Sequence, residues 1–149
     1  MTMKEKILEA FQNLGFEMNG IEGIGYVFHF EDVNFLWVPN EDEEFFNICV
    51  PSFFEKKAID EPTFYQLMDK FNSTLMYVKV NEENENMWMF YERYISGCDN
   101  LEDTIRHMIL HLSRGLHFAR ETIEKASEGN EKEESDADII EDIDKTQEE

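Results

Sequence analysis

The stretch from Thr74 to Ser96 reads TLMYVKVNEENENMWMFYERYIS, and it decides the fold that the sequence predicts. Two apolar runs flank the wholly polar loop NEENEN, which is the pattern of a β-hairpin. A strand with one face on a core and the other in water alternates apolar and polar residues, whereas both faces of this hairpin are rich in apolar side chains. One face can pack against helices of the same chain, so the other face needs a separate explanation.

Pairing Val80 with Met87 across the loop sorts the side chains of this hairpin into two sets. The first set contains Met76, Val78, Val80, Met87, Met89 and Tyr91, and the second contains Leu75, Tyr77, Lys79, Trp88, Phe90, Glu92 and Tyr94. The first set is sufficient to serve the core. The second mixes aromatic rings with charge, so we expect it to face away from the core.

Three further antiparallel strands are predicted at residues 26–30, 33–38 and 45–50. Pairing Phe30 with Val33, and Val38 with Phe45, builds one large apolar face across them. That face contains Tyr26, Phe28, Phe35, Trp37, Phe46 and Ile48. The opposite face receives Val27, His29, Asn34, Leu36, Val38, Phe45, Asn47 and Cys49, a mixture of apolar and polar side chains.

Helical periodicity predicts three helices around these strands. The first covers residues 2–14, with Thr2 and Glu5 as a capping box and Gly15 at its end. The second begins after Asp60, and the third begins at Asp99 and ends near Ala126. The sequence therefore predicts an α+β fold with the order α-β-β-β-α-β-β-α, in which a five-stranded antiparallel sheet carries its helices mainly on one face.

The composition changes at Ser127, which divides the chain into a domain and a tail. Residues 127–149 read SEGNEKEESDADIIEDIDKTQEE, with 11 acids against two lysines. Such a segment buries too little apolar surface to fold by itself. We therefore predict one α+β domain at residues 1–126 and a disordered acidic tail at residues 127–149.

The charge of the chain restricts its partners. Its 149 residues include 34 Asp and Glu against 13 Lys and Arg, for a net charge of −21. Such a chain repels phosphate backbones and anionic membranes, so we expect neither nucleic acid nor a membrane as partner. There is no apolar run of about 18 residues that could span a bilayer. Two distant cysteines suit a reducing compartment, and a cytoplasmic protein is expected.

Few residues suggest catalysis or metal binding. His107 and His111 have the i,i+4 spacing that allows two imidazoles to share a zinc ion, and Cys98 lies just before the third predicted helix. No third ligand is marked, and two polar residues on an exposed helix flank give the same pattern. Cys49, in a strand, fits an inert thiol. We expect no enzyme, no cofactor and no bound metal. The alternative is a small metal-binding or thiol redox protein that uses His107, His111 and Cys98.

The second apolar face of the two hairpins is the stronger functional signal, because interface centres are rich in aromatic residues and Met. A second layer of the same monomer could cover this face, or a partner could do so. We predict a non-catalytic protein-binding or chaperone-like domain that uses the face for dimerisation or client binding. The residues expected to contact the partner are Leu36, Val38, Phe45, Tyr77, Trp88, Phe90 and Tyr94.

The order of the elements also resembles a known fold. The opening stretch ILEAFQNLGF at residues 7–16, the aromatic strands and the acidic composition resemble type III secretion chaperones and the YbjN family of bacterial sensory transduction regulators. The resemblance covers residues 1 to about 126. It implies a small acidic homodimer that holds a segment of a client polypeptide against exposed apolar surface. The long acidic tail departs from the chaperone pattern, and no residue identifies a client.

Overall fold

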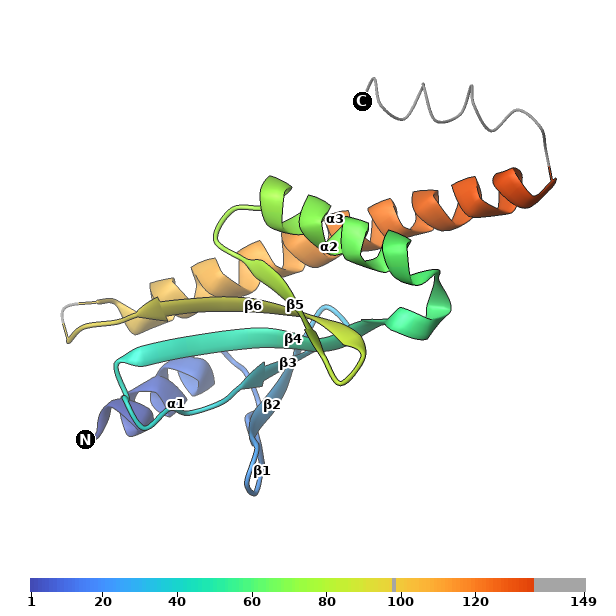
Figure 1. Cartoon of the computed structure of the whole chain (residues 1–149). Helices are drawn as coiled ribbons and strands as arrows, with labels where there is room; N and C mark the ends of the chain where they lie inside the picture. Colours follow the sequence, from blue (N-terminus) through green and yellow to red (C-terminus); the bar gives the residue numbers. More distant parts are fainter. Residues whose placement is uncertain (98, 136–149) are drawn as a thin grey trace. The chain divides into compact units, whose positions relative to one another are not determined.

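The computed structural model describes residues 1–97 and 99–135 (Figure 1). The chain divides into two compact units, Met1–Leu116 and His117–Glu149, and the sheet belongs to the first. In chain order the elements are α1 (Met3–Asn13), β1 (Asn19–Ile21), β2 (Gly25–Phe30), β3 (Val33–Trp37), β4 (Phe45–Glu55), the short 3-10 helix η1 (Lys56–Ala58), α2 (Glu61–Thr74), β5 (Lys79–Glu83), β6 (Asn86–Tyr94) and α3 (Leu101–Ser135). The predicted α+β class is confirmed, but in the described residues the sheet has six strands and not five.

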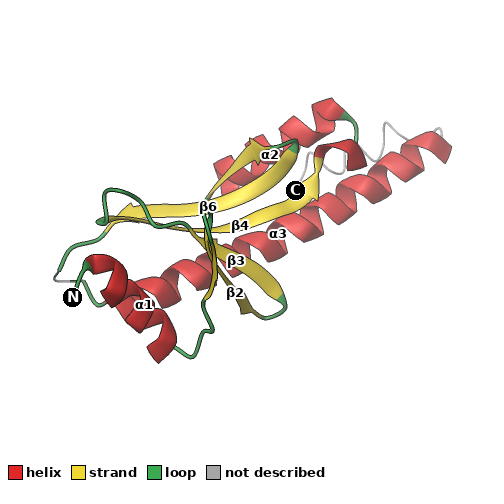
Figure 2. Cartoon of the chain, turned by 90° about the horizontal axis from the view of Figure 1, so that it is seen from below, coloured by secondary structure: helices red, strands yellow, loops and turns green. Residues whose placement is uncertain are grey.

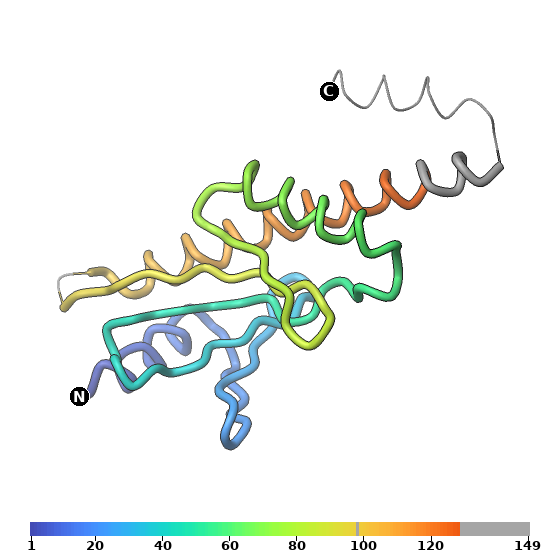
Figure 3. Tube along the Cα trace, in the orientation of Figure 1, coloured from blue at the N-terminus to red at the C-terminus, as the bar shows by residue number. Residues whose placement is uncertain are grey.

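The sheet is antiparallel throughout, with the strand order β1-β2-β3-β4-β6-β5. The additional strand is β1, which lies in the glycine-rich segment that the sequence suggested to be a link. All three of its residues are exposed, so no apolar pattern marks it. Figure 3 shows the β1–β2 hairpin extending away from the rest of the sheet.

The predicted faces of the sheet are correct, although two registers are shifted by two residues. Leu36 pairs with Cys49 and not with Asn47, and Val80 pairs with Met89 and not with Met87. Because side chains alternate with period two, a shift of two residues changes the partners but keeps the paired strand residues on their predicted faces. The β2–β3 register, from Tyr26 opposite Trp37 to Phe30 opposite Val33, is confirmed.

The β5–β6 shift comes from the turn. The polar loop NEENEN contracts to a two-residue connection at Asn84 and Glu85, both of which have positive φ. Glu31 and Asp32 form the same kind of connection between β2 and β3. Turns with two positive φ angles match the right-handed twist of paired strands, which favours this short loop over the longer one.

Two of the three predicted helix starts are confirmed. The side chain of Thr2 accepts a hydrogen bond from the backbone N–H of Glu5, and that of Asp60 accepts one from Thr63. The predicted start of the third helix at Asp99 is wrong, since α3 begins at Leu101. Asn100 caps α3 by accepting from the backbone N–H of Asp103, while Asp99 accepts a hydrogen bond from the backbone N–H of Ser96.

The predicted end of the third helix near Ala126 is also wrong, since α3 continues to Ser135. The acidic composition from Ser127 onward therefore does not end the helix, because Glu and Lys are good helix formers. Residues 136–149, which make up most of the predicted acidic tail, lie outside the described residues. The proposed boundary between domain and tail stays a prediction.

The core lies between one face of the sheet and the helices. Phe11 of α1 contacts the rings of Phe28, Trp37 and Phe46, on three neighbouring strands. Phe64 of α2 stacks on Phe54 of β4, with ring centroids 6.2 Å apart. Figure 2 shows α1 and α3 on the same side of β4 and β6. In the described part of the first unit, no helix covers the opposite face, whereas the sequence predicted only that the helices lie mainly on one face.

Candidate interaction surface

The sheet face that carries no helix is the surface the sequence suggested for binding. We call it the helix-free face and define it by Leu36 of β3, three residues of β4, Lys79 of β5 and four residues of β6. The residues of the two long strands are Phe45, Asn47 and Cys49 of β4, and Trp88, Phe90, Glu92 and Tyr94 of β6. One row of cross-strand partners crosses four strands of this face: Leu36 pairs with Cys49, Cys49 with Phe90, and Phe90 with Lys79.

Aromatic pairs flank this row on the helix-free face. Phe45 lies opposite Tyr94, with ring centroids 5.2 Å apart in an edge-to-face arrangement. The Tyr94 side chain is 66% exposed, whereas Phe45 is half-buried. Trp88 and Phe90 stack along β6 at 6.2 Å, and both are half-buried. Edge-to-face and stacked rings present broad apolar area with little side-chain freedom to lose on binding.

The polar groups of the face are mostly satisfied within the chain. Lys79 Nζ lies 2.6 Å from Glu92 Oε1, which makes the two charges cancel locally. The amide of Asn47 donates to the carbonyl oxygen of Val38 at 3.0 Å. The exception is Trp88 Nε1, a buried donor with no acceptor in the described part of the chain. Buried polar groups are nearly always paired, so this indole N–H is a group that a small rearrangement or a partner would satisfy.

Cys49 lies at the centre of the face and is not a nucleophile. Burial, with a smaller contribution from the nearby Glu92 carboxylate, raises the pKa of the Cys49 thiol to about 12. The thiolate is the reactive form of cysteine, so this thiol is inert at neutral pH. It packs as a small apolar residue, as the sequence suggested.

The seven residues predicted to contact a partner do not form one group. Phe45, Trp88, Phe90 and Tyr94 share the helix-free face, together with Leu36, which its neighbours bury. Val38 follows β3 directly and is exposed. The predicted face for Tyr77 is wrong: its φ is 69°, so strand alternation has not begun there, and its ring stacks on Tyr91 of the helix-covered face. Met76, expected in the core, is exposed for the same reason.

Sequence reasoning left out Asn47, Lys79 and Glu92 as candidate contact residues, although it placed them on the correct face. The cross-strand register could have identified these three residues, because Asn47 lies opposite Glu92 and Lys79 lies opposite Phe90. A polar pair beside an apolar row is a common arrangement at the rim of an interface.

The two histidines of the alternative hypothesis lie close together. The rings of His107 and His111 are 4.2 Å apart, and the Tyr91 hydroxyl lies 3.1 Å from His107 Nδ1. Among the side chains that the structure describes, in residues 1–97 and 99–128, no three of His, Cys, Asp or Glu come together as a metal site would require. Cys98, the third residue of that hypothesis, lies outside the described residues. His29 is exposed on β2, and His117 contacts Glu121 at 3.1 Å.

A charged cluster braces α2 against the edge of the sheet. The Tyr65 hydroxyl donates to Glu82 Oε1 at 2.7 Å, and Lys56 Nζ lies 3.0 Å from Glu82 Oε2. The hydrogen bonds from Tyr65 and Lys56 lower the pKa of the Glu82 carboxyl, and the contribution of Tyr65 is the larger. A carboxylate held ionised in this way acts as an anchor and not as a general acid. Of the helices described, none combines the length and the apolar character that crossing a bilayer requires.

Comparisons with known proteins agree with this fold. No protein-family model matches the sequence, and no curated protein matches it. An uncharacterized protein from Methanothermobacter thermautotrophicus has a similar structure, with a TM-score of 0.59 and 15% identity over 84% of this chain and 99% of that one. YbjN from E. coli, described as a candidate transcription regulator, has a TM-score of 0.56 and 11% identity over 80% of this chain and 92% of that one. At these identities the likeness concerns architecture alone. The chain therefore has a YbjN-like fold.

Proposed function

We propose that this protein is a non-catalytic binding domain whose helix-free face takes a polypeptide partner, in the first place a second copy of the chain. The observation that carries the proposal is that two aromatic pairs, Phe45 with Tyr94 and Trp88 with Phe90, lie on a sheet face that no described helix covers. Leu36 and Cys49 lie buried beneath this surface. A regulatory or binding role suits a fold similar to that of YbjN, described as a candidate regulator.

The local charge of the face supports a polypeptide partner over a small charged ligand. The whole chain carries −21, yet Lys79 and Glu92 neutralise each other on this face. Burying a neutral, aromatic surface against another polypeptide avoids the cost of desolvating unpaired charge. Acidic surface elsewhere keeps the chain soluble while the face is free. Homodimerisation, client holding and a cytoplasmic location belong to this proposal.

Sedimentation velocity on the wild type and on Tyr94→Asp tests the second copy as partner. Tyr94 is exposed and contacts Phe45, so an aspartate there leaves the core intact and places an unpaired charge in the interface. We expect a wild-type dimer, and a dissociation constant at least about 30-fold higher for the variant, as for an interface hot spot. Ile24→Asp, at a 54% exposed position in the β1–β2 connection, is the matched control and should dimerise normally.

A client polypeptide is the other possible occupant of the face. A photo-crosslinking residue at position 94 would capture a client in cell extract, and the same residue at position 24 would not. The proposal fails if the wild type stays monomeric up to about 1 mM and the residue at position 94 captures no more protein than the one at position 24.

A further inference from the structure

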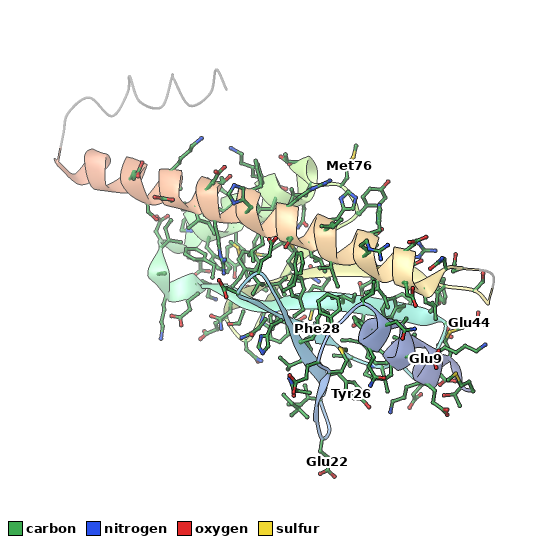
Figure 4. The ribbon with its side chains drawn as sticks, turned by 180° about the vertical axis from the view of Figure 1, so that it is seen from behind. Glu9, Glu22, Tyr26, Phe28, Glu44 and Met76 are labelled. Atoms are coloured by element: carbon green, nitrogen blue, oxygen red, sulfur yellow. The ribbon has the colours of Figure 1, made fainter. Side chains whose placement is uncertain are left out.

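A second exposed surface lies on the opposite side of the sheet, where the segment after α2 meets α3. We call it the Tyr77 patch and define it by Met76, Tyr77, His107, Leu110, His111 and Arg114. Met76 and Tyr77 are 77% and 61% exposed, and Leu110 is also exposed. His107, Leu110, His111 and Arg114 follow the i, i+3, i+4, i+7 spacing that places them on one helix face. Figure 4 shows Met76 projecting outward from the molecule.

The contacts of Tyr77 fix the patch in place. Its ring stacks parallel to Tyr91, with centroids 5.8 Å apart, and lies 5.0 Å from the ring of His107 and 4.7 Å from that of His111. Leu75 packs near Gly115 of α3, where a glycine leaves room for the approach. The segment is therefore laid against α3 by contacts at both of its ends.

The backbone of Tyr77 is strained to make this arrangement. Its φ of 69° lies in the left-handed region, which costs a residue with a bulky side chain about 1–2 kcal/mol. Strain of this kind persists only where surrounding contacts enforce it, and it is concentrated at functional sites. Here the left-handed backbone of Tyr77 keeps its aromatic ring at the surface, whereas an extended backbone would direct the ring to the other face of the sheet.

The patch is unusual in its charge. The two longest stretches of the sequence without an acidic residue are 104–120, with 17 residues, and 70–81, with 12. The Tyr77 patch is where these two stretches meet. None of its six residues is acidic, in a chain with 34 acids, and Arg114 has no ion pair in the part of the chain that the structure describes. The nearest carboxylate on this helix face, Asp103, is engaged by Arg106 at 2.9 Å.

We infer that the Tyr77 patch binds an acidic polypeptide segment that also carries aliphatic side chains. Arg114 and the two imidazoles supply donors for carboxylates, and a guanidinium can hold a carboxylate with two hydrogen bonds. Met76, Tyr77 and Leu110 supply apolar area for the aliphatic side chains. A nucleic acid suits the patch less well, because its phosphates would extend onto acidic surface on either side. This site is separate from the helix-free face and from the function proposed for it.

Binding at the patch should depend on pH. Burial, His107 and Arg114 all lower the pKa of His111, in that order of size, which favours the neutral imidazole in the free protein. Tyr77, from the segment after α2, packs directly on the His111 ring. Tyr91 of β6 contacts Tyr77 and His107, and Arg93 of β6 lies near Tyr91. A docked carboxylate favours the protonated imidazole, so binding takes up a proton and strengthens as the pH falls.

Fluorescence anisotropy with a labelled peptide, DEIDLEEIDD, tests the inference on the full-length chain in 150 mM NaCl. We expect binding by the wild type that strengthens about three- to tenfold between pH 7.5 and pH 6.0, since one coupled proton gives at most tenfold per pH unit. Arg114→Gln and Leu110→Asp should each weaken binding at least about fivefold, within the range of a lost charged or apolar contact. Arg114→Lys, which keeps the charge, should retain part of the affinity.

The controls separate this site from general charge effects and from the helix-free face. Lys70→Gln removes one positive charge from an exposed position of α2, and Tyr94→Asp disrupts the helix-free face; neither should alter peptide binding. A peptide with glycine in place of Ile and Leu should bind weakly. The inference is wrong if DEIDLEEIDD does not bind, if the glycine peptide binds equally well, or if the patch variants bind like the wild type. It is also wrong if a 12-nucleotide single strand of DNA binds more tightly than the peptide. A Leu110→Asp variant that loses peptide binding only because it no longer self-associates would contradict it as well.

Discussion

Gly25 is a position where the surrounding backbone allows only glycine. Its φ is 154°, and a Cβ atom built on it would overlap the carbonyl oxygen of Trp37. Only glycine allows β2 to begin so close to the end of β3. Gly23, two residues earlier in the β1–β2 connection, has a φ of 79° and open space around it. Gly25 is therefore required because of its contact with Trp37, whereas Gly23 is favoured only by its dihedral angle.

Gly25→Ala and Gly23→Ala should differ strongly in stability. We expect Gly25→Ala to lower the free energy of unfolding by about 3 kcal/mol or more, because the methyl group clashes with main chain that cannot move away. Gly23→Ala should cost about 1–2 kcal/mol, the price of a left-handed residue with a side chain. Urea unfolding followed by tryptophan fluorescence measures both values. Equal costs for the two substitutions would contradict the role assigned to the Trp37 carbonyl.

At the scale of an element, β5 illustrates how an exposed sheet edge is closed. It is the last strand in the order, so the outward main-chain groups of its residues have no strand to pair with. Asn72 of α2 takes the place of that strand. Its Oδ1 accepts from the Val80 N–H at 2.6 Å, and its Nδ2 donates to the Val80 carbonyl at 2.9 Å. Covering an edge in this way prevents pairing with a strand of another molecule.

Asn72→Ala should therefore weaken β5 locally as well as the fold as a whole. Two partly buried main-chain groups lose their partners, which costs about 1–3 kcal/mol of unfolding free energy. Hydrogen exchange at the Val80 amide should become faster by at least about tenfold, the change expected for 1.4 kcal/mol. Ser73→Ala removes only an exposed hydrogen bond to the Lys70 carbonyl and serves as the control. Unchanged exchange at Val80 would show that Asn72 does not close the edge.

At the scale of the whole molecule, the net charge of −21 affects both stability and association. The acids repel one another in the folded chain, and two copies that met on the helix-free face, as proposed, would also repel one another. Ion pairs relieve little of this repulsion, since most of those in the described residues are exposed. Salt screens such repulsion, with a Debye length that falls from about 30 Å at 0.01 M to about 8 Å at 0.15 M.

The melting temperature should therefore rise with salt. Between 20 and 300 mM NaCl we expect an increase of about 3 °C or more, corresponding to roughly 1 kcal/mol for a chain of this size. Differential scanning calorimetry gives the value, and KCl should produce the same shift as NaCl. Glycerol at matched osmolality is the control and should shift the melting temperature less. A melting temperature that stays constant or falls would mean that attractive ion pairs outweigh the repulsion.

The sequence by itself determined the element order from α1 to α3, apart from β1 and η1, and the side-chain faces of the predicted strands from β2 to β6. Periodicity carries that information, and it survives a register shift of two residues because strand side chains alternate. The tertiary structure decided what periodicity does not encode. The β5–β6 turn has only two residues, Asn84 and Glu85, and β1 pairs with β2 without an apolar pattern in its sequence. Tyr77 lies on the side of the sheet opposite to the predicted one. Each of these depends on main-chain geometry and long-range contact, so the helix-free face was predictable and the Tyr77 patch was not.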